Sequence, residues 1–353
     1  MAKELRVGIA GYGVVGKRRH EVIEQHSAFK TVAVCDQTFA AGDHLPGGVA
    51  CWHHPGQLLE QDLDVLFVCL PNDVAADVTI AGLERGLHVF CEKPPGRDLS
   101  DVARVVAAQQ KYPKLKLKYG FNHRYHDSVR DALAVVSAGA MGQVINLRGI
   151  YGKSKFISFA QHSDWRTQRV VAGGGILLDQ GIHMVDLMRL FAGEFVQVKS
   201  FISNDFWHHD VEDNAYALLR TKSGCVAMLH STATQWRHRF NLDITLEKGA
   251  LTLSGILSGS KSYGAETLTI AWAGDDDSGD PKEQTTRYNQ DNSWRDEIAD
   301  FADAILSGRP IDAGSVDDAF RTMQLVYRIY CADPEWRARW GLIDEIPNGE
   351  QRR

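Results

Sequence analysis

The stretch of sequence that decides the fold lies near the amino terminus and reads Leu5-Arg-Val-Gly-Ile-Ala-Gly11-Tyr-Gly13-Val-Val-Gly16. Its apolar first half predicts a strand, and residues 17–25 can continue as a helix after the glycines. A strand, a Gly-x-Gly-x-x-Gly turn and a helix in this order are typical of a dinucleotide-binding fold. Gly11 allows a tight turn, Gly13 lets the backbone approach a pyrophosphate, and Gly16 lets the helix pack on the strand. The pyrophosphate is expected at the helix N-terminus, where unpaired N–H groups and the helix dipole favour negative charge.

A second strand, expected at residues 31–35, ends in a carboxylate that suits the cofactor. Asp36 follows this strand and can bond the ribose hydroxyls of adenosine while repelling a 2′-phosphate. The next two residues are Gln and Thr, with no Arg to receive that phosphate, so the sequence favours NAD over NADP. The basic residues 17–19 would favour NADP, but we expect them to form a solvated helix face instead.

Strands and helices continue to alternate through residue 121. Strand-like runs at 64–71, 86–95 and 115–121 flank helix-like segments at 72–85 and 98–110, which predicts a doubly wound parallel sheet. In such sheets ligands bind beyond the carboxyl ends of the strands, so the loops there are expected to face the cofactor. The expected cofactor contacts are Gly11, Tyr12, Gly13, Val14, Val15, Gly16, Asp36, Leu70, Pro71, Asn72, Glu92 and Lys93.

The loop Glu92-Lys93-Pro94 carries the first candidate for chemistry. An exposed ion pair is the ordinary interpretation of a Glu-Lys dipeptide, but its place after a strand of a dinucleotide fold favours function. Pro94 restricts Lys93 to extended conformations and thereby fixes the direction of its ammonium group.

The second candidate lies in residues 173–191, which are predicted to form one helix. At 3.6 residues per turn, Asp179, His183 and Asp186 lie at i, i+4 and i+7 on one face. His titrates nearest neutrality and a neighbouring carboxylate can hold its tautomer, so this row suits proton transfer. The alternative is the wet face of a surface helix.

Glycines mark the start and the middle of this helix. The triplet at 173–175 predicts backbone N–H groups that can meet a ligand, and Gly181 predicts that another group packs closely on the helix. The opposite face carries an apolar stripe of Met184, Leu187, Met188 and Phe191.

From about residue 123 the pattern changes to many short strands, so the predicted domains are 1–122 and 123–353, with closing helices from about 294. The turns between them predict a mostly antiparallel sheet with the 173–191 helix on one face. The expected strands are 144–151, 196–203, 215–221, 225–232, 241–245, 250–254 and 267–271.

Clusters of aromatic and polar residues at 122–125, 162–166, 207–210 and 236–238 could line a substrate site. Each is more often a surface loop or a packed aromatic, but together they suit a polyol better than an apolar ligand. Adjacent histidines at 208 and 209 lack the partner spacing of a metal site, and no metal is expected. The expected substrate contacts are Asn122, Arg124, Trp165, Arg166, Asp179 and His183.

The composition excludes several classes of protein. With 39 Lys and Arg against 45 Asp and Glu, the chain of 353 residues has a net charge of −6, which argues against nucleic-acid binding. The charged amino terminus and the lack of a long apolar run predict a soluble, cytoplasmic protein that does not enter a membrane. Six cysteines without a Cys-x-x-Cys pair are expected to be buried reduced thiols.

Four motifs together make the chain resemble the glucose–fructose oxidoreductase, inositol dehydrogenase and rhizopine-catabolism (Gfo/Idh/MocA) family. They are the glycine fingerprint, Glu92-Lys93-Pro94, Asp164-Trp165-Arg166 and the segment Gly173-Gly-Gly-x-x-x-Asp179-x-Gly181-x-His183-x-x-Asp186. The resemblance implies a Rossmann domain followed by an α/β domain with a large open sheet that forms homodimers or homotetramers. It also implies that Lys93, Asp179 and His183 surround the reacting carbon beside the nicotinamide. The second domain looks like that of members acting on sugars for cell-surface saccharides.

The resulting hypothesis is an NAD-dependent dehydrogenase acting on a secondary hydroxyl of a sugar, cyclitol or nucleotide sugar. His183 would take the proton, Lys93 would stabilise the alkoxide and Asp179 would orient the substrate or His183. Whether Lys93 or His183 is the formal base stays open, because the two would titrate as a coupled group. An NAD-recycling glycosidase and a non-catalytic regulatory protein that binds dinucleotide and sugar are the alternatives.

Overall fold

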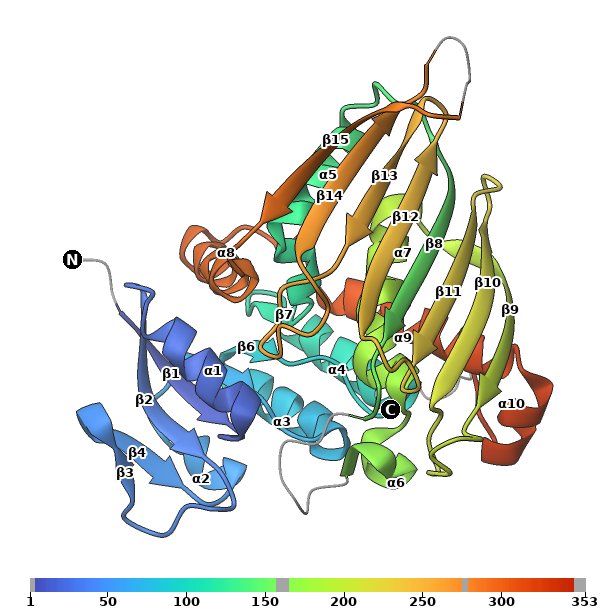
Figure 1. Ribbon diagram of the computed structural model, residues 1–353. Helices are drawn as coiled ribbons and strands as arrows, with labels where there is room; N and C mark the ends of the chain where they lie inside the picture. The colour runs from blue at the N-terminus through green and yellow to red at the C-terminus, as the bar shows by residue number, and fades with distance from the viewer. Residues whose placement is uncertain (1–3, 157–164, 275–278, 346–353) are drawn as a thin grey trace.

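The structure is a computed structural model that describes residues 4–156, 165–274 and 279–345. Two sheets organise it, one of seven strands near the amino terminus and one of eight strands (Figure 1). The first sheet has the order β3-β4-β2-β1-β5-β6-β7 and is parallel except for the short β3. Its strands are β1 (Leu5–Ala10), β2 (Phe29–Cys35), β3 (His44–Leu45), β4 (Val49–Trp52), β5 (Val65–Val68), β6 (His88–Cys91) and β7 (Leu117–Tyr119).

This strand order fixes where a ligand can bind. The chain runs outward from β1 through β2 and then restarts at β5 on the other side of β1. The strand order therefore reverses between β1 and β5, and the crevice beyond their carboxyl ends is the expected binding site of such a sheet. The helices that follow the strands are α1 (Val14–Ile23), α2 (Pro55–Leu58), α3 (Asn72–Glu84) and α4 (Leu99–Lys111).

The second sheet has the order β15-β14-β13-β12-β8-β11-β10-β9, and β8 with β11 is its one parallel pair among the described residues. The prediction of a mostly antiparallel sheet is confirmed. The sequence missed β15, because its side chains are polar and nearly all exposed, so it carries no apolar alternation. The strands are β8 (Val144–Gly152), β9 (Phe195–Ser203), β10 (Asn214–Thr221), β11 (Val226–Thr232), β12 (Arg239–Leu246), β13 (Gly249–Ser254), β14 (Glu266–Trp272) and β15 (Lys282–Tyr288).

Helices cover one face of this sheet and leave the other face open (Figure 1). The predicted stripe on α7 is confirmed, since Met184, Leu187 and Met188 are fully buried. The open face exposes large apolar side chains instead, with Phe201 80% and Met228 53% exposed. The helices are α5 (Asp127–Ser137), α6 (Arg169–Ala172), α7 (Ile182–Ala192), α8 (Ser293–Ser307), α9 (Val316–Cys331) and α10 (Pro334–Trp340).

Helix α8 returns to the first sheet after the second sheet is complete. Phe301 on α8 is fully buried and packs on Phe67 of β5 and Phe90 of β6, at centroid distances of 6.1 and 5.6 Å. The core of the amino-terminal part therefore includes side chains from near the carboxyl end of the chain. The division into 1–122 and 123–353 stays a prediction.

Two expectations from composition concern thiols and membranes. All six cysteines are free, and five of them are buried, while Cys69 is partly exposed. Within the described ranges, no helix combines the length and the apolarity needed to cross a membrane.

Candidate active site

A cavity of about 1010 Å³ opens at the carboxyl ends of β1, β2, β5 and β6. Ten of the twelve expected cofactor contacts line it, and Tyr12 and Gly16 do not. A Cβ on Gly16 would lie 2.0 Å from the Gly11 carbonyl oxygen, so this glycine serves the packing of α1. A Cβ on Gly13 would meet nothing within 4 Å, which leaves its backbone open to a ligand. The space and the free N-terminus of α1 fit a dinucleotide.

Asp36 lies at the end of β2 and lines this cavity. Its carboxylate accepts a hydrogen bond from the Tyr12 backbone N–H at 2.9 Å and from the Thr38 hydroxyl at 2.8 Å. These bonds hold the acid beside the glycine turn, as a ribose contact requires. Several lining side chains were not predicted, His53 and His54 among them, because these two precede the short helix α2 rather than a recognised motif.

The expectation of a solvated basic face on α1 is wrong for Arg19, while Lys17 is exposed and Arg18 is partly exposed. Arg19 is fully buried, and its guanidinium donates to Glu92 at 2.6 Å and to Glu297 of α8 at 2.8 Å. Arg18 lies over the Trp294 ring at 4.1 Å. Lys17 does line the cavity. Arg19 thus ties the loop that carries Lys93 to both α1 and α8.

Lys93 and Asp179 meet at the wall of the cavity. The Lys93 ammonium donates to the Asp179 carbonyl oxygen at 2.5 Å and lies 3.6 Å from its carboxylate, while Arg166 lies 3.5 Å from the same carboxylate. Burial raises the pKa of Asp179, but Lys93, Arg166 and Lys153 outweigh it, and the net pKa is lowered. Asp179 is therefore an ionised carboxylate, and its Oδ2 has no hydrogen-bond partner among the described residues.

The predicted single helix over 173–191 is wrong. A π-helical turn, Leu177–Gly181, precedes α7 and contains Asp179, so the expected i, i+4, i+7 row does not form. Such turns recur at functional sites. Asp186 faces away from the cavity and accepts two 2.7 Å bonds from Arg124. The wet-surface interpretation is also wrong, because Asp179, His183 and Asp186 are all buried.

His183 is 5% exposed and does not line the cavity. Burial lowers the pKa of its imidazole well below the ordinary value, and the charge of Lys93 and the neighbouring His126 lower it further. The imidazole is therefore neutral at neutral pH, which is the form that accepts a proton.

The glycine triplet meets an internal carboxylate instead of a ligand. Glu212 is fully buried and accepts hydrogen bonds from the Gly175 N–H at 2.7 Å and the Leu177 N–H at 3.0 Å. The Tyr330 hydroxyl donates to it at 2.6 Å. The prediction of close packing at Gly181 is confirmed, since a Cβ there would lie 2.4 Å from Ser231 Oγ.

Of the remaining expected substrate contacts, two line the cavity and two do not. Trp165 and Arg166 line the cavity, with the guanidinium 4.2 Å from the indole ring. Arg124 does not line it, because Asp186 and Asp318 occupy its guanidinium. Asn122 is also outside it, and its amide donates to Ser293 at 3.0 Å. We therefore leave both out of the proposed substrate site. Part of the 162–166 cluster, His162 to Asp164, lies outside the described residues.

Sequence reasoning missed Lys153, which follows the carboxyl end of β8. Burial lowers its pKa to about 8; Asp179 works against this, and the positive charges of Lys93 and Arg166 add to the lowering. Its position directly after a strand could have identified it as a candidate. It was not considered because β8 belongs to the second sheet, where no ligand was expected at the strand ends.

The comparisons with known proteins agree with this architecture. The family model "Oxidoreductase family, NAD-binding Rossmann fold" matches residues 5–121, and the "GFO/IDH/MocA C-terminal domain" model matches 129–252. A D-glucoside 3-dehydrogenase of Escherichia coli is 27% identical over 92% of this chain and 94% of that protein. An inositol 2-dehydrogenase of Salmonella typhimurium is 24% identical over 75% of this chain and 78% of that protein.

Solved structures share the fold of the whole chain. Levoglucosan dehydrogenase in complex with NADH superposes with a TM-score of 0.81 at 20% identity, covering 95% of this chain and 98% of that one. An aldose-aldose oxidoreductase from Caulobacter crescentus gives a TM-score of 0.79 at 23% identity, covering 94% and 98%. Since residues 5–121 and 129–252 match the two family models and the cavity has the geometry of a dinucleotide site, the chain belongs to the Gfo/Idh/MocA family of oxidoreductases with an NAD-binding Rossmann fold.

Proposed function

We propose that the protein is an NAD-dependent dehydrogenase acting on a secondary hydroxyl of a sugar or cyclitol. One observation carries the proposal: a single cavity joins the glycine turn of Gly11 and Gly13 to Lys93 and Asp179. A dinucleotide on the turn and a polyol beside Lys93 would then occupy one space. The relatives named above are dehydrogenases of a glucoside and of inositol, which favours a substrate of this class over a nucleotide sugar in saccharide biosynthesis.

The residues divide the chemistry between them. When bound, the nicotinamide supplies the hydride acceptor for the substrate C–H bond. His183 is neutral and buried near Lys93. Its ring does not line the cavity, so the proposal requires the bound sugar to reach it, and there it takes the hydroxyl proton as the carbonyl forms. Lys93 donates hydrogen bonds to the oxygen on which negative charge develops. Asp179 is ionised, and one of its oxygens has no partner among the described residues. This oxygen accepts a hydrogen bond from a neighbouring hydroxyl of the substrate and so orients the sugar.

A substrate panel tests this function. Nicotinamide absorbance is followed with NAD or NADP against free sugars, glucosides and inositols. Turnover of one of them supports the dehydrogenase. If the protein binds NADH and reduces or oxidises none of them, the regulatory alternative gains support; cleavage of a glycoside without added cofactor supports the NAD-recycling glycosidase.

Asp36 is proposed to select NAD over NADP. Asp36→Ala removes a charge that would repel a 2′-phosphate and a bond to the ribose hydroxyls, so the NAD/NADP ratio of kcat/KM should fall about 10- to 100-fold, the range expected for a charged hydrogen bond. Asp36→Asn is the matched control: it keeps an acceptor for the Tyr12 N–H but lacks the charge. Unchanged discrimination in both variants would show that another group, such as Lys17, governs the choice.

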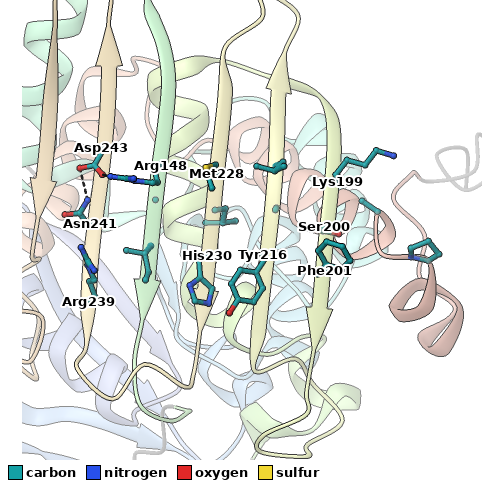
Figure 2. Close-up of a pocket in the computed structure, with 17 residues that line it drawn as sticks. Arg148, Lys199, Ser200, Phe201, Tyr216, Met228, His230, Arg239, Asn241 and Asp243 are labelled. Carbon is teal, nitrogen blue, oxygen red and sulfur yellow. Dashed lines mark hydrogen bonds and ion pairs between the residues drawn. The ribbon is translucent and has the colours of Figure 1, made fainter. Parts of the chain in front are cut away.

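The open face of the second sheet is proposed to form a homodimer or homotetramer. Figure 2 shows Phe201, Tyr216, Met228 and His230 projecting from neighbouring strands of this face, and they line a hollow of about 890 Å³. Tyr216 and His230 stack at 4.0 Å. Contiguous exposed apolar side chains of this kind mark a contact surface for protein.

Charges introduced on this face should separate the subunits. The double variant Leu218→Glu and Met228→Glu buries two carboxylates in the proposed interface, so its mass should fall to that of a 39.2 kDa monomer in light scattering. Gln284→Glu on the exposed strand β15 is the control and should keep the wild-type mass. A wild-type protein that is already monomeric at micromolar concentration would contradict the proposal.

A further inference from the structure

A second buried histidine lies against His183. The ring centroids of His123 and His183 are 3.8 Å apart, and their planes differ by 11°. Both rings are buried, at 7% and 5% exposure. The Phe121 ring meets His183 edge-on at 6.2 Å. Parallel rings at this distance touch over their whole faces, so His123 forms a wall that sets the plane of the His183 imidazole.

A chain of hydrogen bonds fixes the tautomer of His123, and its direction follows from the carboxylate at one end. Asp291 can only accept, so the Ser293 hydroxyl donates to it at 2.6 Å. Ser293 then accepts from the Asn122 amide N–H at 3.0 Å, which turns the amide oxygen toward His123 Nδ1 at 3.3 Å. An amide oxygen only accepts, so Nδ1 carries the hydrogen. Nε2 is left to accept from the Tyr151 hydroxyl at 3.2 Å.

Several groups oppose a positive charge on His123. Burial is the main reason that its pKa lies well below the ordinary value, and His183, His126 and Lys93 lower it further. Tyr151 stays protonated, because burial raises its pKa. His126, next to His123, donates a 2.9 Å hydrogen bond from Nδ1 to the Glu266 carboxylate of β14, so this N–H does not point at His123. His123 is therefore a neutral ring whose two nitrogens are both engaged.

We propose that His123 is a positioning residue for His183: the bond that it donates to Asn122 and the bond that it accepts from Tyr151 hold its ring in one neutral tautomer, and its face holds the His183 imidazole in the orientation that receives the substrate proton. This rests on the proposed role of His183. His123 itself touches neither the cavity nor the proton. Its contribution is to restrict the rotation of a catalytic ring whose Nδ1 has no hydrogen-bond partner among the described residues.

Two substitutions at His123 separate stacking from hydrogen bonding. His123→Phe keeps a flat ring of similar size and should retain kcat within about 5-fold, while His123→Ala removes the wall and should lower kcat about 20-fold or more, since small misplacements of a reacting group are costly. KM and the affinity for NADH, measured by fluorescence, should change less than about 3-fold in both, because neither contact involves His123. His44→Ala, at an exposed histidine on β3, is the control.

The titration of His183 gives a readout that needs no substrate. In NMR spectra of histidine-labelled protein, with the His183 signal assigned from its absence in His183→Asn, His123→Ala should raise the pKa of His183 because water reaches the ring. His123→Phe should leave it low. Asn122→Asp should raise the pKa of His123, since a carboxylate beside Nδ1 stabilises the imidazolium.

The proposed function and the positioning role of His123 can be disproved independently of each other. If the wild-type protein oxidises no sugar or cyclitol, the proposed function is wrong, yet the titration still tests the contact between the histidines. If the wild-type protein is active and His123→Ala keeps both its kcat and the wild-type pKa of His183, the positioning role is overturned. A drop in melting temperature of His123→Ala with kcat unchanged per folded molecule would also overturn it, because it would show a structural role alone.

Discussion

Lys93→Ala is expected to lower kcat by about 100-fold or more, the usual loss when a charged group that stabilises a developing alkoxide is removed. Lys93 lines the cofactor cavity, and its ammonium contacts both the carbonyl oxygen and the carboxylate of Asp179. Removing it leaves the substrate oxygen without a cationic donor. It also takes away the charge that lowers the pKa of both Asp179 and His183.

The affinity for NADH should hardly change in this variant, because the groups proposed to hold the dinucleotide, the glycine turn and Asp36, are unaltered. Single-turnover absorbance with the best substrate of the panel measures the chemical step, and fluorescence titration measures cofactor binding. Lys114→Ala, at an exposed lysine outside the cavity, serves as the control. Turnover that survives in Lys93→Ala would remove Lys93 from the mechanism.

The parts of the fold with a repeating pattern were predictable. The parallel sheet follows from buried apolar runs such as β5, and the cofactor loops follow from their positions at strand ends. The antiparallel strands β10 to β12 bury alternate residues, which is the pattern that sequence analysis detects. Strand β15 has no such pattern, because it lies at the sheet edge with polar side chains.

The errors at the site come from partners that are distant in sequence. Arg19 was expected at the surface because its buried partner Glu297 lies 278 positions later in the sequence. The glycine triplet was expected to bind a ligand because nothing nearby in the sequence predicts that Glu212 accepts from the Gly175 N–H. Helical spacing predicts that Asp186 shares a face with Asp179 and His183, but the structure has a π-helical turn there and pairs Asp186 with Arg124 in the core. Residue types at helical spacing predict neighbours on one element, not partners across elements.

His183→Asn is expected to lower kcat for oxidation by about 100- to 1000-fold, since it removes the group that accepts the hydroxyl proton while keeping a polar side chain of similar size. If His183→Asn stays active while Lys93→Ala is inactive, Lys93 is the proton acceptor and the two roles must be exchanged. Asp179→Asn gives the third comparison: it should raise KM more than it lowers kcat, because Asp179 is proposed to orient the sugar rather than to move the proton.

The pH profile tests the same assignment in the wild-type enzyme. A proton acceptor must be neutral, and burial holds the pKa of His183 well below 6.5. Oxidation should therefore stay constant as pH falls through 6.5 and decline only at pH values well below 6.5, where the imidazole gains its proton. Reduction of the ketone needs the protonated form and should become faster over the same range.

The loss of folded protein at low pH has to be distinguished from the loss of activity caused by protonation of His183. Buried histidines with lowered pKa values, His123 and His183 among them, take up protons on unfolding, so the free energy of unfolding is retained above pH 6.5 and falls as pH drops below it. Melting temperature and kcat are therefore measured on the same samples at each pH. An acid limb centred at or above pH 6.5 in protein that remains folded would contradict a neutral, buried His183 as the proton acceptor.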